Sequence, residues 1–118
     1  MRNLVAVLAL LSLAACSVGP DDRAEDFVEA TANGNTAEAI EHLDPQIRQM
    51  MGPKVMAGVQ SQIETIRQRG GLMSVDALNP VIAGDSATVD VKIQYKSAPE
   101  ENGKMKLRKV DGDWYVTP

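Results

Sequence analysis

The chain has 118 residues, a formal net charge of −4 and few aromatic residues, with one Phe, one Trp and two Tyr. This length suits a single compact domain, and the shortage of aromatic side chains predicts a modest core of aliphatic residues and methionine. An acidic chain lacks the clustered Lys and Arg side chains that nucleic acids and anionic membrane surfaces attract. Neither is therefore expected as a partner.

The first stretch of the chain has the order of an export signal. Arg2 is followed by the almost unbroken apolar run Leu4–Leu13, then by two alanines and Cys16, the only cysteine. The run is well short of the ~20 residues that a membrane-spanning helix requires. Small side chains at its end allow the extended backbone that a signal peptidase needs. The pattern predicts a secretory signal.

The segment Leu13-Ala14-Ala15-Cys16 resembles the lipobox of bacterial lipoproteins. In that family the cysteine is acylated and the preceding peptide is removed. The resemblance implies that residues 1–15 are a cleaved signal peptide and that Cys16 is the lipidated first residue of the mature chain. An uncleaved anchor and a secretory peptide with a coincidental cysteine are the alternatives. Because Ser17 rather than Asp follows the cysteine, the resemblance also implies an outer-membrane location facing the periplasm in a Gram-negative host.

Residues 16–20 are predicted to form the lipidated N-terminus and a short linker ahead of one domain that spans residues 21–118. Four extended residues after the cysteine reach about 13 Å, at ~3.3 Å each. The acyl chains are therefore expected to hold the domain close to the membrane. With the cysteine acylated, no thiol remains for a disulfide, so packing alone must hold the fold.

Helical periodicity starts at Asp21, and Asn33-Gly34 is predicted to end the first helix. Asn35 is expected to cap a second short helix, with Glu38 three residues later in the manner of a capping box. Asp44-Pro45 predicts a further helix start, because a capping side chain precedes a proline at the first helical position.

The later helical segments carry most of the methionines. Met50 and Met51 are expected to continue the inner face until Gly52-Pro53 breaks or kinks the chain. The longest helix is predicted from Pro53 to Gln68. Its inner stripe is predicted to consist of Val55, Met56, Val59, Ile63 and Ile66.

From residue 72 the apolar period changes to two, which is typical of half-buried strands. The predicted strands cover residues 72–78, 87–95, 104–110 and 114–116. Asp111-Gly112 is predicted to be a tight hairpin turn. Helices followed by an antiparallel meander predict an α+β domain, with about three helices packed on a curved sheet of about four strands.

Two segments carry a resemblance to a known superfamily. One runs from Phe27-Val28-Glu29-Ala30 through Gly34-Asn35 to Leu43, and the other is Leu107–Val116. With this order of elements, the chain resembles the nuclear-transport-factor-2-like (cystatin-like) superfamily, above all its small uncharacterised bacterial lipoprotein domains. The resemblance covers roughly residues 21–118.

His42 is the only histidine, and a metal site would want a second nitrogen or sulfur ligand. No metal and no cofactor are therefore expected. Glu38, Glu41 and Asp44 lie close to it in the sequence. A solvated helix end is the preferred interpretation of His42.

The superfamily includes ketosteroid isomerase-like enzymes, so the resemblance opens an enzymatic alternative. Such a site needs an inward-facing carboxylate whose pKa is raised by burial. Asp90 lies in mid-strand but shares the face of Lys92, whereas Tyr95 points inward and can donate a hydrogen bond. A hydrogen-bond donor without a general base beside it cannot carry out an isomerisation, so no catalytic residue is assigned.

Two groups of side chains are candidates for binding. Met50, Met56, Tyr95 and Trp114 are candidates for lining a pocket, although core packing is the preferred interpretation of all of them. The basic residues of the strands are expected on a shared outer face, where they keep the sheet soluble or dock an acidic partner. They are Lys92, Lys96, Lys104, Lys106 and Arg108.

We therefore expect a lipid-anchored, non-enzymatic envelope protein that binds a partner protein or a small apolar ligand near the membrane. A small isomerase-like enzyme and a structural accessory subunit of an envelope complex are the alternatives. A closed core would exclude a pocket. A cavity of more than roughly 300 Å³ with a buried carboxylate beside Tyr95 would favour the enzyme.

Overall fold

The computed structural model describes residues 18–118. The predicted signal peptide and Cys16 lie outside this range. Four helices come first in the described part, namely α2 (Pro20–Ala32), α3 (Thr36–Glu41), α4 (Pro45–Met51) and α5 (Lys54–Gln68). Four strands follow, namely β1 (Leu72–Ala83), β2 (Ser86–Tyr95), β3 (Glu101–Val110) and β4 (Asp113–Thr117).

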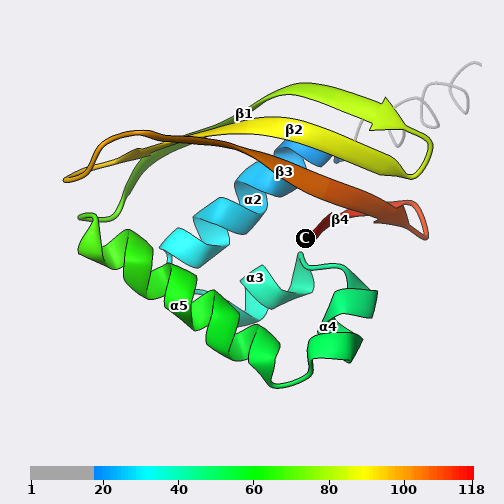
Figure 1. Cartoon of the computed structure of the whole chain (residues 1–118), viewed down its shortest axis with the longest axis horizontal. Helices are drawn as coiled ribbons and strands as arrows, with labels where there is room; N and C mark the ends of the chain where they lie inside the picture. Colours follow the sequence, from blue (N-terminus) through cyan, green and yellow to red (C-terminus); the bar gives the residue numbers. More distant parts are fainter. Residues whose placement is uncertain (1–17) are drawn as a thin grey trace, which may run out of the picture.

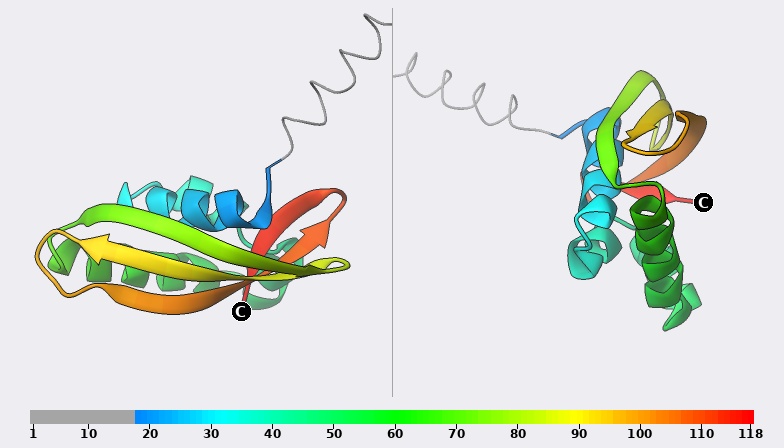
Figure 2. Two further views of the ribbon diagram at one scale, coloured as in Figure 1. Left: turned by 90° about the horizontal axis from the view of Figure 1, so that it is seen from above. Right: turned by 90° about the vertical axis from the view of Figure 1, so that its left-hand side faces the viewer.

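The strands form one antiparallel sheet in the order β1-β2-β3-β4, and the helices lie together on one side of it (Figures 1 and 2). The predicted α+β class and the curved four-stranded sheet are confirmed. A fourth helix is present because Gly52, with a φ of 54°, separates α4 from α5. Between residues 18 and 118, no helix combines the length and the apolar character that crossing a bilayer requires.

Both predicted helix caps are confirmed. Asn35 accepts a hydrogen bond from the Glu38 N–H at 3.2 Å, and Asp44 accepts one from the Gln46 N–H at 2.9 Å. The Glu38 carboxylate accepts from the side-chain amide of Asn35, at 3.0 Å. Each cap satisfies one of the backbone donors that a helix start leaves free. Helix α2 begins at the buried Pro20, one residue before the predicted start.

The corner between α3 and α4 is fixed to the last strand. The Asp44 N–H donates to the Val116 carbonyl and the Val116 N–H donates to the His42 carbonyl, both at 2.8 Å. This short parallel bridge lies at the outer edge of β4. It brings the helical half of the chain against the C-terminal strand.

Strand β1 is longer than predicted and irregular. It continues to Ala83, with a break in register between Leu78 and Val81. Asn79 has a φ of 53°, and Pro80 has no N–H to donate to the sheet. Asn79 and Pro80 are residue types typical of turns, yet the strand continues past them to the turn at Gly84 and Asp85.

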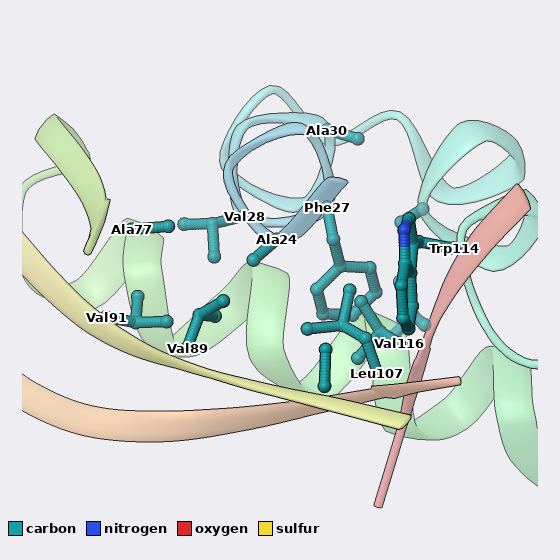
Figure 3. Packing of buried hydrophobic residues seen from close by; sticks show 13 residues of the cluster. Ala24, Phe27, Val28, Ala30, Ala77, Val89, Val91, Leu107, Trp114 and Val116 are labelled. Atoms are coloured by element: carbon teal, nitrogen blue, oxygen red, sulfur yellow. The ribbon is translucent and has the colours of Figure 1, made fainter. Parts of the chain in front are cut away.

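The core fills the space between α2 and the sheet (Figure 3). Phe27 and Trp114 lie against aliphatic side chains of β2, β3 and β4, including Val89 and Leu107. The methionines contribute little to it. The prediction that Met50, Met51 and Met56 face inward is wrong, because all three are exposed on α4 and α5. Helix α4 has no buried residue at all.

Candidate functional site

The end of α5 is held against the end of β2. The Ser97 N–H donates to the Arg69 carbonyl at 2.9 Å, and the Lys96 N–H donates to the Gly71 carbonyl at 3.0 Å. Gly70 has a φ of 85°, and a Cβ at this position would collide with Ser97. Glycine is the residue that adopts this left-handed backbone conformation without strain, and it has no Cβ to collide with Ser97. The connection fixes where α5 crosses the sheet and places Arg69 beside Tyr95.

A groove of about 440 Å³ opens between α2, α5 and the sheet. Its apolar lining comes from both layers and consists of Phe27, Val28, Leu43, Ile66, Ile93, Met105 and Val116. Helix α5 adds the polar side chains of Gln62 and Thr65 along one wall. The volume lies within the range of ~300–1,000 Å³ that is typical of small-molecule sites. The helices and the sheet therefore leave a groove beside the packed core.

Three polar side chains gather in the lining of this groove. The Tyr95 hydroxyl donates to Glu101 Oε1 at 2.8 Å, and Arg69 Nη1 lies 3.3 Å from the same oxygen. The Arg69 guanidinium also stands over the Tyr95 ring, 4.9 Å from its centroid. Cation and aromatic face attract each other at this distance. The three side chains form a polar cluster, here called the Arg69–Tyr95–Glu101 cluster.

The electrostatics of this cluster favour hydrogen-bond donation over proton abstraction. Burial raises the pKa of Tyr95, and its hydrogen bond to Glu101 raises it further. The phenol therefore stays protonated at neutral pH. Contact with Tyr95, and then with Glu101, raises the pKa of Arg69. The Glu101 side chain is 51% exposed, so it is not the buried carboxylate that an isomerase-type base requires.

The residues predicted as pocket candidates lie in three different places. Tyr95 lines the groove, as a buried residue at the end of β2. Trp114 is buried in the hydrophobic core. Met50 and Met56 are exposed, away from the groove lining. Met105 is the methionine that does line it.

The predicted basic face is largely neutralised by carboxylates. Lys104 Nζ lies 2.7 Å from Asp90, and Lys92 Nζ lies 3.7 Å from Glu100. Arg108 reaches across the edge of the sheet to Asp44 and does not stand free on the outer face. Three of the five basic residues predicted for this face are therefore paired with carboxylates.

The pair between Asp44 and Arg108 joins the helical layer to the sheet. Arg108 donates from Nε and Nη2 to the two carboxylate oxygens, each at 2.6 Å. The Asp44 side chain is only 3% exposed. The Arg108 hydrogen bonds hold the pKa of this carboxyl below its usual value, against the opposing effect of burial.

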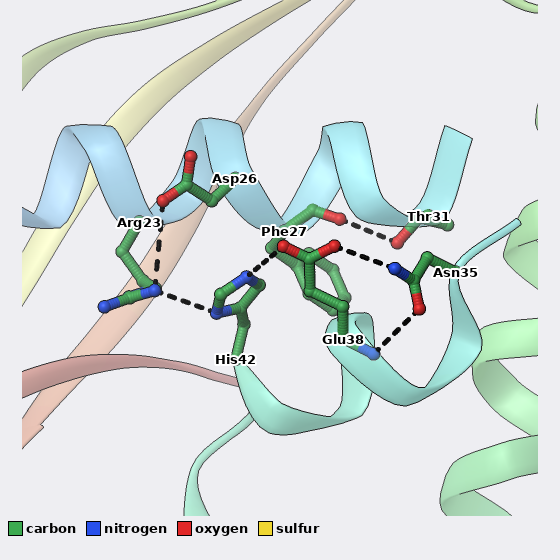
Figure 4. A network of polar contacts seen from close by, with 7 residues as sticks. All are labelled: Arg23, Asp26, Phe27, Thr31, Asn35, Glu38 and His42. Atoms are coloured by element: carbon green, nitrogen blue, oxygen red, sulfur yellow. Dashed lines mark hydrogen bonds and ion pairs between the residues drawn. The ribbon is translucent and has the colours of Figure 1, made fainter. Parts of the chain in front are cut away.

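His42 is not the solvated helix end that the sequence suggested. Its side chain is 12% exposed and lies between α2 and α3 (Figure 4). Arg23 Nη1 donates to His42 Nδ1 at 2.9 Å, which requires the neutral ring with its proton on Nε2. Nε2 faces Glu38 at 3.8 Å. Burial, and then the charge of Arg23, lowers the pKa of His42.

Sequence reasoning missed Arg69 and Glu101. Glu101 was assigned to a turn, but it pairs with Ile93 in the sheet and so shares the inner face. Arg69 follows the last residue of α5, where a basic residue normally indicates only a helix end. Within residues 18–118, no three His, Cys, Asp or Glu side chains converge in a way that could hold a metal ion.

Similarity to known proteins agrees with this architecture. A solved protein of Campylobacter jejuni, described as a candidate NTF2-like transpeptidase, superimposes with a TM-score of 0.71. The two chains are 20% identical, and the match covers 84% of this chain and 97% of the other. At this identity the likeness shows a shared NTF2-like fold and nothing about chemistry.

A second solved protein is more distant. RPA3114 of Rhodopseudomonas palustris, which contains a SEC-C motif, has a TM-score of 0.53 and 19% identity, over 76% of this chain and 68% of that one. None of the curated proteins matches the sequence. The profile of a family described as a domain of unknown function, DUF4878, matches residues 14–117. The chain therefore belongs to the DUF4878 family, with an NTF2-like fold.

Proposed function

We propose that this protein is a lipid-anchored component of the bacterial cell envelope that binds a small, largely apolar ligand in the groove between α5 and the sheet. The groove is the observation that carries the proposal. It has the volume of a small-molecule site, and most of its lining is aliphatic or aromatic. A partner protein or a purely structural role would not require an open groove beside the core of so small a domain.

The Arg69–Tyr95–Glu101 cluster defines the chemistry of the ligand. An apolar molecule with one polar head group satisfies both parts of the lining, because its tail can lie against residues such as Ile66 and Ile93. The head group then meets the Arg69 guanidinium and the Tyr95 hydroxyl. A fully apolar molecule would leave these groups without a partner other than Glu101.

Binding fits the lining better than acyl transfer or isomerisation. The described residues that line the groove include no Cys, Ser or His. Thr31 and Thr65 donate their hydroxyl protons to carbonyls of their own helices, Phe27 and Ser61 respectively. A transpeptidase-like reaction needs an activated nucleophile beside a base. Thr117, the third threonine of the lining, contacts the Asp44 carboxylate, but Arg108 holds the pKa of that carboxyl below its usual value, which makes it a poor base.

The lipid anchor rests on the lipobox-like segment that ends at Cys16. Two acyl chains contribute about 0.8 kcal/mol per buried methylene, which makes attachment lasting. The first described residue, Val18, is two positions later. The anchor thus tethers the whole domain to the bilayer, where apolar molecules concentrate.

A matched pair of variants on α5 tests the binding site. Thr65→Trp places a large ring on an exposed helix position that lines the groove, whereas Ser61→Trp places the same ring one turn earlier, outside the lining. The probe is dansyl-undecanoate, an apolar chain with a carboxylate head. We expect saturable binding to the native protein and to Ser61→Trp, and loss of binding in Thr65→Trp. Equal binding by all three proteins, or none by the native protein, would contradict the proposal.

A further inference from the structure

The end of the sheet at the β1–β2 turn carries apolar side chains that no other part of residues 18–118 covers. Leu78, Val81 and Ile82 are 49%, 68% and 55% exposed, although each belongs to a strand. Leu78 and Val81 pair with Asp90 and Thr88 on the outer face of the sheet. The segment from residue 78 to residue 86 is here called the β1–β2 tip. Large exposed aliphatic groups gathered in one place mark a contact surface.

The β1–β2 tip is unsuited to pairing with another strand. It lies at the edge of the sheet, but Pro80 has no N–H to donate and the register breaks between Leu78 and Val81. Proline and bulges are devices that block edge-to-edge pairing. Further along the same edge, the Ala77 N–H is already occupied by Glu25, at 2.9 Å. The tip therefore exposes apolar side chains but no free row of backbone hydrogen-bonding groups. Such a surface is better suited to contact with lipid hydrocarbon than to pairing with a strand of another protein.

The position of the tip matches the position of the chain end. Helix α2 begins at the end of the molecule that carries the β1–β2 turn (Figure 1, and the left view of Figure 2). From the contact between Glu25 and Ala77, α2 extends about 7.5 Å to Pro20 at ~1.5 Å per residue. Strand β1 extends about 16 Å to Ile82 over the same number of residues. The tip therefore projects roughly 9 Å beyond the start of the helix.

The linker can span this difference. Cys16 lies four residues before Pro20, and an extended linker of that length reaches about 13 Å. An acylated Cys16 can therefore lie level with the β1–β2 tip. Ile82 pairs with the inward-facing Ala87 but is exposed because it lies beyond the end of α2.

We infer that the β1–β2 tip inserts into the surface of the bilayer that holds Cys16, as a second membrane contact that orients the domain. This inference rests on the lipid anchor of the proposed function. On the neighbouring strand β3, Arg108 is paired with Asp44 and the Lys109 N–H donates to the Asp85 carbonyl. No basic residue belongs to the tip itself. Asp85 lies in its turn, and Asp111 and Asp113 lie in the β3–β4 turn. The carboxylates restrict the contact to shallow insertion and favour zwitterionic over anionic lipid.

The test uses the full lipidated protein in phosphatidylcholine vesicles. With Cys16 acylated, Ile82→Cys supplies a single reactive thiol for an environment-sensitive fluorophore, and Val81→Cys is a second variant at the tip. Gln68→Cys, at the last residue of α5, is the matched control, since it lies at the opposite end of the molecule (Figure 1). Lipids that carry a nitroxide on the acyl chain serve as quenchers.

We expect the probes at positions 81 and 82 to show blue-shifted emission and to lose emission with nitroxide lipid, while the probe at position 68 shows neither effect. The shift should be smaller in vesicles with phosphatidylglycerol. If the protein binds the vesicles but the probes at positions 81 and 82 behave like the probe at position 68, the membrane contact of the tip is contradicted while the lipid anchor still stands. A blue shift without quenching would overturn it in favour of a protein contact. Failure of the protein to float with the vesicles would overturn the anchor, and the inference with it.

Discussion

Replacing Asp44 with Asn tests the connection between the two layers with little change in shape. The carboxylate is almost fully buried and accepts two hydrogen bonds from Arg108 and one from the Gln46 N–H. Asparagine can still cap α4 but turns an N–H₂ group toward a guanidinium that has only donors. Breaking a buried ion pair costs about 3–5 kcal/mol. Because Arg108 is 40% exposed and can regain water, we expect a loss of about 2–3 kcal/mol.

The measurement is urea unfolding followed by the fluorescence of Trp114, the only tryptophan, which lies in the core. Because the pKa of Asp44 is lowered in the folded protein, its stabilising effect is present above the unfolded value of 3.8 and is lost as the pH falls through the folded value. The difference between native protein and Asp44→Asn should therefore shrink in acid. Asp90→Asn, which breaks an exposed pair with Lys104, is the control and should lose much less. An Asp44→Asn protein as stable as the control would refute the reasoning.

Two further predictions concern the α5–β2 connection and the buried histidine. Gly70→Ala should destabilise the protein by more than the ~1 kcal/mol expected from left-handed strain alone, because the new Cβ meets Ser97. Gly34→Ala has a similar φ but open space around it, so the difference between their melting temperatures isolates the collision. His42 has a lowered pKa when folded, so the unfolded chain binds the proton first and stability should fall as the pH drops below 6.5. This fall should be absent in His42→Gln, and a native urea midpoint that is constant between pH 7.5 and 5.5 would count against it.

Much of the fold could be predicted because local signals agreed with one another. Asn35 and Asp44 are helix caps in both the sequence pattern and the structure, and the alternation from Ala87 to Tyr95 is a half-buried strand. Asp111 and Gly112 both have positive φ in the predicted hairpin turn. Each of these features depends on residues only a few positions apart, so no knowledge of tertiary contacts was needed.

Features that depend on distant contacts could not be predicted. Met50 and Met56 fall at helical spacing, but Met50 lies on α4, which has no buried residue, and Met56 lies in the first turn of α5 on its exposed side. Arg108 has the parity of an outward-facing residue, yet its long side chain reaches an aspartate 64 positions away. Tyr95 was placed on the inner face by parity. Its partner Glu101 was missed because the strand β3 begins three residues before the predicted position, within an apparent turn.

Native mass spectrometry of the protein extracted from its own membranes tests the central claim most directly. The proposed function predicts a mass of residues 16–118 plus acyl chains, together with a non-covalent apolar adduct that is present in Ser61→Trp and absent in Thr65→Trp. An unprocessed chain that begins at Met1 would contradict the anchor. An acylated chain without an adduct, or with the same adduct in both variants, would contradict the binding site.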